Sequence, residues 1–241
     1  ISRWVSPDPA GERLLDEWII NTREKKEHAI DQIYFNINLY IYANNNPVIY
    51  IDPNGLEAWE ITNQWNEQWI QAYQEWIPGF LENYSEEIDC ADLAITAIIE
   101  FASENGLPVS FRYWDSNARR YRIMNASDQV FTSKDQFLSV SKNRLGALGV
   151  IDNTRSININ EAGPGDLIMS RWSNSSGHTR VIHSISSLPN SDYNIIWYQG
   201  NIPEVVPERR EMTWNNLLNQ TNTAGVSWVY QSLPRRWSFM Q

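Results

Sequence analysis

The sequence is poor in cysteine and histidine, and it has no long apolar run. Cys90 is the single cysteine among 241 residues, so no disulfide can form within the chain. One cysteine and three scattered histidines cannot build a zinc site of the usual spacing, and we expect neither a metal nor a cofactor. No run of about 18 apolar residues occurs, so we expect no membrane span.

Positive charge is also scarce. The formal net charge is −10, with 19 Lys and Arg against 29 Asp and Glu. Because proteins hold nucleic-acid phosphates with Lys and Arg, we expect no nucleic-acid partner. Residues 57–104 hold eleven carboxylates and no basic residue. That stretch is either a solvated acidic surface or a docking face for a basic partner, such as an inhibitor or carrier protein.

The chain divides near residue 58. Residues 1–58 contain two Asp-Pro-x-Gly turns, which begin at Asp8 and Asp52. In such a turn proline fixes φ and glycine accepts a positive φ. Between the turns lies a charged, helix-prone stretch, followed by the strand-like residues 38–43 and a turn at residues 44–47.

Three phrases of this first part resemble the C-terminal end of an Rhs-repeat core: residues 3–9 (RWVSPDP), 38–48 (NLYIYANNNPV) and 52–56 (DPNGL). In that family the core forms a shell around a variable C-terminal toxin. The resemblance implies that Asp8 and Asp52 take part in self-cleavage after Leu56. It also implies an Rhs shell and an immunity protein as partners, and secretion into a target cell through a specialised secretion system.

Residues 59–241 begin with a helical stripe of aromatic and aliphatic side chains that we expect Pro78 and Gly79 to end: Trp65, Trp69, Tyr73, Trp76 and Ile77. Such a stripe packs into a core or stacks on sugars, and we favour core packing. A second helix is predicted from Cys90 to Glu104, closed by the C-cap signal of residues 105–108. A strand at 109–113, a helix at 133–145 and strands at 165–169, 178–185 and 194–198 follow. The order predicts an α+β fold, with a helical lobe before an antiparallel sheet.

Cys90 is a candidate nucleophile because of its predicted position at a helix start. The partial positive charge and free N–H groups of a helix N-terminus favour a thiolate and can hold an oxyanion. Asp89 beside it raises the thiol pKa, or instead caps the helix or orients another group. For a general base, His178 follows a glycine-rich turn at the entrance of a strand. His183 is the alternative, and it is expected on the opposite face of that strand. His28 lies among charged residues, so we expect it on the surface.

Three further phrases, residues 89–93 (DCADL), 165–168 (GDLI) and 177–182 (GHTRVI), together resemble the NlpC-type branch of papain-like hydrolases. The resemblance covers about residues 85–205. It implies a papain-like fold in which the helical lobe carries Cys90 and the sheet carries His178. A polar orienting residue is then expected from the next strand, at Gln199 or Asn201. Asp166 is either a catalytic carboxylate or, as we favour, the residue that closes a turn.

The resemblance implies a cysteine peptidase or amidase that cuts an amide, in a target peptide or in peptidoglycan, through an acyl-enzyme. The alternative with the same thioester chemistry is a deamidase or transglutaminase-like effector that modifies Gln or Asn of a target protein. A third reading is a tryptophan-rich binding module in which the cysteine has no chemical role.

Overall fold

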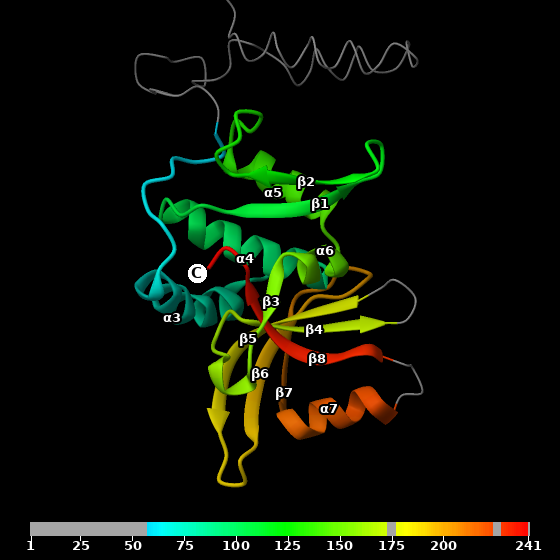
Figure 1. Cartoon of the computed structure of the whole chain (residues 1–241). Helices are drawn as coiled ribbons and strands as arrows, with labels where there is room; N and C mark the ends of the chain where they lie inside the picture. The colour runs from blue at the N-terminus through cyan, green and yellow to red at the C-terminus, as the bar shows by residue number, and fades with distance from the viewer. Residues whose placement is uncertain (1–56, 173–176, 224–227, 241) are drawn as a thin grey trace, which may run out of the picture.

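The computed structural model describes residues 57–172, 177–223 and 228–240 (Figure 1). The turns at Asp8 and Asp52 and the junction at Leu56 lie outside the described residues. The elements follow in this order: α3 (Glu67–Asn83), α4 (Cys90–Glu104), β1 (Ser110–Asp115), β2 (Arg120–Asn125), α5 (Lys134–Arg144), α6 (Ala147–Asp152), β3 (Thr154–Ser156), a 3-10 turn (Ile159–Glu161), β4 (Leu167–Trp172), β5 (Gly177–Ser187), β6 (Tyr193–Gln199), β7 (Glu208–Thr213), α7 (Trp214–Thr223) and β8 (Trp228–Trp237). The described residues therefore form a mixed α+β fold, as predicted.

The main sheet has six strands in the order β3-β8-β4-β5-β6-β7, and each neighbouring pair is antiparallel. β8, near the end of the chain, lies between β3 and β4 rather than at an edge. A separate antiparallel hairpin joins β1 to β2. Figure 1 shows this hairpin beside α5, away from the six-stranded sheet.

Two hydrophobic clusters cover the two faces of the six-stranded sheet. The larger one joins α3 and α4 to residues such as Leu167 and Val181. The smaller one joins α7 to Ile168 and Ile182. Consecutive residues of β4 and β5 enter different clusters because side chains alternate along a strand. α4 is the central helix of the larger cluster, since it is buried along most of its length.

The aromatic stripe packs into the core, which confirms that prediction: Trp65 and Tyr73 are 6% and 2% exposed. The predicted end of the helix is wrong, because α3 continues past Pro78 to Asn83. Proline removes one helical hydrogen bond. Here Ile77 and Leu81 are almost fully buried on either side of it, and each such side chain contributes about 1.5–3 kcal/mol through burial.

α4 has the bounds that the sequence predicts. At its end the N–H of Leu107 donates to the carbonyl of Ala102 at 2.8 Å, and Gly106 takes a φ of +59°. This is the hydrogen-bond pattern of a Schellman cap, in which glycine accepts the left-handed conformation.

The other predicted elements, a strand at 109–113, a helix at 133–145 and strands at 165–169, 178–185 and 194–198, correspond to β1, α5, β4, β5 and β6 with shifted ends. The sequence reasoning did not predict β2, α6, β3, β7, α7 and β8. β2 and β7 lack the alternation that marks a half-buried strand, since four consecutive residues of each are exposed.

Candidate active site

Cys90 is the first residue of α4 and is 6% exposed. Asp89 caps the helix, because its Oδ1 accepts the backbone N–H of Asp92 at 2.7 Å. The predicted cap at Asp89 is therefore confirmed. The backbone N–H groups of Thr179, Ala91 and Cys90 itself lie close to the sulfur and act to lower the pKa of the thiol. The sulfur thus lies where the helix N-terminus meets β5.

Gly200 lets the segment before Cys90 approach the sheet. A Cβ atom at Gly200 would lie 2.2 Å from the carbonyl oxygen of Ile88 and 2.6 Å from that of Asp89. The N–H of Asn201 donates to the same Ile88 oxygen at 3.3 Å, and Ile88 bridges to Val205. Sequence reasoning missed this role of Gly200. The available signal was a glycine at the end of a strand next to a candidate site residue.

His178 is the second residue of β5 and is 9% exposed. Its ring is hydrogen-bonded to the side chain of Gln199. Gln199 is itself held in place, because its Oε1 accepts the indole N–H of Trp197 at 3.0 Å. An amide oxygen that accepts a ring N–H orients an imidazole and favours its charged form.

Asn201, the other candidate for the third position, does not reach His178 among its described contacts. Its Oδ1 accepts the backbone N–H of Ile202 at 2.9 Å, and the residue is exposed. The structure therefore brings Gln199 to His178 and leaves Asn201 in the following turn.

His183 lies on a different part of the surface. Its Nε2 is 2.9 Å from Oε1 of Glu82 on α3, and its ring lies 5.6 Å from that of Tyr198. A register irregularity falls at His183, between Ile182 and Ser184. The third histidine, His28, lies outside the described residues.

Burial dominates the electrostatics of the candidate pair. It raises the pKa of the Cys90 thiol, and Asp89 adds to this effect, while the three backbone N–H groups oppose it. Burial, with help from Arg180, lowers the pKa of His178 to about 4, although Gln199 and Asp89 act in the other direction. At neutral pH the site therefore holds a thiol and a neutral imidazole.

The link between Cys90 and His178 is indirect in this structure. Among the described contacts, the His178 ring bonds to Gln199 and not to the sulfur. The N–H of Thr179, which contacts the sulfur, belongs to the peptide that joins His178 to Thr179. The Cys90 sulfur therefore contacts β5 at the peptide next to His178.

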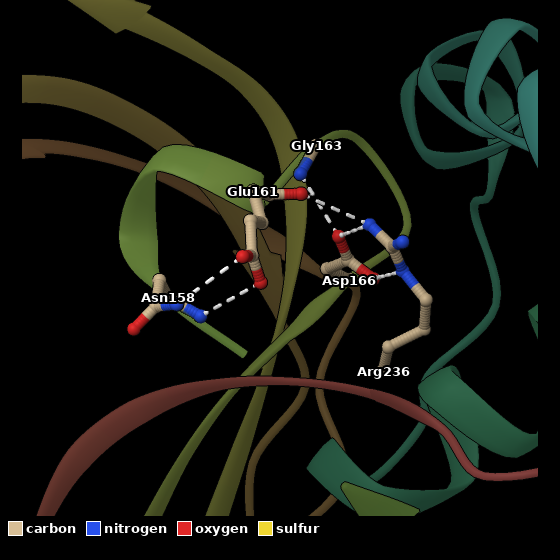
Figure 2. Close-up of polar contacts among 5 residues, drawn as sticks. All are labelled: Asn158, Glu161, Gly163, Asp166 and Arg236. Atoms are coloured by element: carbon tan, nitrogen blue, oxygen red, sulfur yellow. Dashed lines mark hydrogen bonds and ion pairs between the residues drawn. The ribbon is translucent and has the colours of Figure 1, made fainter. Parts of the chain in front are cut away.

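Asp166 closes a turn, as we favoured, and lies in a buried ion pair (Figure 2). Its carboxylate accepts two hydrogen bonds from Arg236, from Nε and Nη2, each at 2.7 Å, and one from the N–H of Gly163 at 2.9 Å. All of these contacts lie within the turn and β8. Asp166 is 4% exposed, and burial raises its pKa in spite of Arg236.

Within residues 57–172, 177–223 and 228–240, no group of three or more His, Cys, Asp and Glu side chains is placed to hold a metal ion. In the same part of the chain no helix is long and apolar enough to cross a membrane. No protein-family model, no curated protein and no solved structure matches the chain.

Proposed function

We propose that residues 59–241 are a papain-like cysteine hydrolase of the NlpC type, which cuts an amide bond through Cys90 and His178. One arrangement supports this proposal. A sulfur at a helix N-terminus receives three backbone N–H groups, and the adjacent strand carries a histidine that is held by a side-chain amide. A nucleophile, a base and an orienting amide are the three parts that such a site needs.

In the proposed reaction the Cys90 sulfur attacks the amide carbonyl, and His178 takes the thiol proton. The backbone N–H groups at the start of α4, which lie against the sulfur at rest, stabilise the oxyanion. The C–N bond then breaks as His178 gives its proton to the leaving amine. Water, activated by the same imidazole, hydrolyses the thioester and releases the acid.

Because both groups are neutral at rest, the proton moves to His178 during attack rather than before it. The ring must also turn towards the sulfur when the substrate binds. Catalytic hydrogen bonds are often long in sites without substrate and shorten in the complex.

The proposed biological role is that of an effector domain of a polymorphic toxin. Residues 1–58 are then the remnant of an Rhs core, with Asp8 and Asp52 acting in cleavage after Leu56. The partners would be the Rhs shell, an immunity protein and peptidoglycan or a peptide of the target cell, reached through a specialised secretion system.

Mass spectrometry of purified peptidoglycan tests the hydrolase. We expect the wild-type chain to release fragments that have gained water at an amide, and Cys90→Ala to release none. Unchanged peptidoglycan, together with conversion of Gln to Glu or Gln cross-linking in a target protein, would favour the deamidase or transglutaminase alternative. Equal activity of Cys90→Ala would refute cysteine catalysis altogether.

A matched pair of variants tests the third position. We expect Gln199→Ala to lower kcat/KM by about 100-fold, within the usual contribution of acid–base catalysis, because His178 loses its orienting bond. Asn201→Ala is the control and should change kcat/KM little, since the Asn201 side chain accepts the backbone N–H of the next residue, Ile202. The assignment fails if the two variants lose equal activity.

A further inference from the structure

The hairpin of β1 and β2 has one closed edge and one open edge. Asn153 closes the β1 edge, because its Oδ1 accepts the N–H of Arg112 at 2.6 Å and its Nδ2 donates to the carbonyl of Arg112 at 2.7 Å. On the β2 side the described residues supply no further strand. Among the described contacts, the backbone of residues 120–124 pairs with β1 alone. Alternate N–H and C=O groups of β2 therefore point away from the hairpin.

The two faces of β2 differ in chemistry. Arg120 and Arg122 share one face, because they alternate along the strand with Tyr121 and Ile123 on the other. All four residues are exposed. Arg122 pairs with Asp115 at 2.7 Å, whereas Arg120 forms no ion pair among the described residues. A basic face and an apolar face therefore meet at the same open edge.

The apolar face extends from β2 onto β1. Trp114 lies opposite Tyr121 in the register, and the two side chains are 53% and 46% exposed, while Ile123 is 63% exposed. The guanidinium carbon of Arg112 lies 3.8 Å from the centroid of the Tyr121 ring. Exposed apolar patches with a polar rim mark interaction sites, and Trp, Tyr and Arg dominate the binding energy of protein interfaces. The outer face of the hairpin thus has the composition of a protein-binding surface.

The charge of the hairpin is opposite to that of the whole chain. Residues 110–125 contain four arginines and one aspartate, whereas the formal net charge of the chain is −10. β7, at the edge of the six-stranded sheet, provides a contrast. Its residues 208–211 are two glutamates and two arginines, which pair with each other. Of these two edges, β2 offers unbalanced positive charge, so charge complementarity favours an acidic partner there.

We propose that β2 accepts an extended acidic segment of another protein as a third strand. Main-chain hydrogen bonds at the open edge hold the segment, which a lipid surface cannot supply. Its side chains alternate, so carboxylates lie beside Arg120 and Arg122, and apolar side chains lie beside Tyr121 and Ile123. The inference does not rest on the hydrolase, because the hairpin lies away from the six-stranded sheet that carries His178 (Figure 1).

A synthetic strand tests this surface on the full chain. The probe is a seven-residue peptide that alternates glutamate with valine and is blocked at both ends. Amide hydrogen exchange should slow in β2 when the probe binds, and it should not change in β7. We expect the probe to bind about tenfold more tightly than the same peptide with lysine in place of glutamate, because like charges then meet at the edge. If every β2 amide already exchanges slowly in the free chain, the edge is covered and the inference is wrong.

Two N-methylated forms of the probe separate strand pairing from attraction between charges. In one form the glutamate amides cannot donate, and in the other the valine amides cannot. A strand presents alternate amides to each of its edges, so one form should lose binding and the other should keep it. Equal binding of both forms would refute pairing at the edge. Binding to phosphatidylglycerol vesicles without binding of the probe would assign the patch to a lipid surface instead.

Charge reversal on the protein completes the test. Arg120→Glu should weaken binding of the glutamate probe by about tenfold and should shift the preference towards the lysine peptide. Arg209→Glu, at an exposed arginine of β7, is the matched control and should change neither affinity. Equal losses in the two variants would contradict a site at β2. A dimer of the free chain that Arg120→Glu dissociates would show that a second copy, not an acidic partner, occupies the edge.

Discussion

At the residue scale, burial controls the state of both candidate catalytic groups. Cys90 and His178 are 6% and 9% exposed, and loss of hydration is the largest cause of each pKa shift. Loss of water disfavours whichever form carries charge, so the thiol keeps its proton and the imidazole stays without one. The resting pair is therefore less reactive than an ion pair would be, and it depends on substrate to start proton transfer.

The low pKa of His178 predicts a loss of stability in acid. In the unfolded chain the imidazole binds a proton near its ordinary pKa of 6.5, whereas in the folded chain it does so only near 4. Between these values the unfolded state holds more protons, so stability falls as pH falls. The shift corresponds to about 3 kcal/mol, present above pH 6.5 and lost by about pH 4.

We expect His178→Gln to remove this part of the acid loss. The measurement is the free energy of unfolding in urea near the two ends of that pH window, for wild type and variant. His183→Gln keeps His178 and should retain the wild-type difference. The same pH dependence in wild type and His178→Gln would show that His178 does not titrate as a buried group.

At the element scale, the start of α4 and the end of β6 must approach closely for Cys90 to reach β5. The two segments meet at Gly200. A Cβ atom there would clash with backbone oxygens of the segment just before the helix. Backbone atoms move aside less easily than the end of a flexible side chain. The space at this glycine therefore controls the position of Cys90.

Gly200→Ala should therefore destabilise the fold by about 1–3 kcal/mol, as overpacking does, and should shift the rate at which Cys90 is alkylated. Gly79→Ala is the matched control. Nothing lies within 4 Å of a Cβ at Gly79, which is inside α3. There alanine should stabilise by about 0.5–1 kcal/mol through helix propensity. Thermal unfolding of both variants measures the contrast, and a harmless Gly200→Ala would contradict the close approach.

The pair of Asp166 and Arg236 connects the turn before β4 to β8. Arg236→Met would leave a buried carboxylate without its partner, which costs about 3–5 kcal/mol at neutral pH. The cost should shrink as pH falls, because Asp166 then takes a proton. The exposed pair of Arg209 and Glu211 supplies the control, since Arg209→Met should cost less than about 1 kcal/mol. Equal losses in urea unfolding would show that the pair adds no more than a surface contact.

At the scale of the whole molecule, the sheet is complete only when β8 enters between β3 and β4. Trp237 at the end of β8 is fully buried in the larger cluster. Arg235 fixes the same strand to β3, because its Nε donates to Oγ1 of Thr154 at 2.7 Å. The last residues of the chain therefore hold together strands that precede them by about seventy to eighty positions.

Two truncations should differ sharply. The described core runs from Ala58 to Met240, so a chain of residues 57–241 should unfold cooperatively, with a normal thermal transition. A chain that ends at residue 227 lacks β8 and leaves β3 and β4 without their shared neighbour, so it should show no cooperative transition. Circular dichroism during heating measures both. Failure of residues 57–241 to fold would mean that the core needs the preceding part of the chain.

Much of the candidate site was predictable, because few residues compete for each role. One cysteine and three histidines leave a short search. The cap at Asp89 and the turn at Asp166 follow from local chemistry.

The sequence by itself determined the ends of α4 and the shortlist that contains Cys90 and His178. These depend on caps, turns and residue types within a few positions of each other. Only the tertiary structure decided that Gln199 rather than Asn201 reaches His178, and that α3 passes through Pro78. Each of these depends on which distant residues pack together, because burial and long-range contacts outweigh local preference.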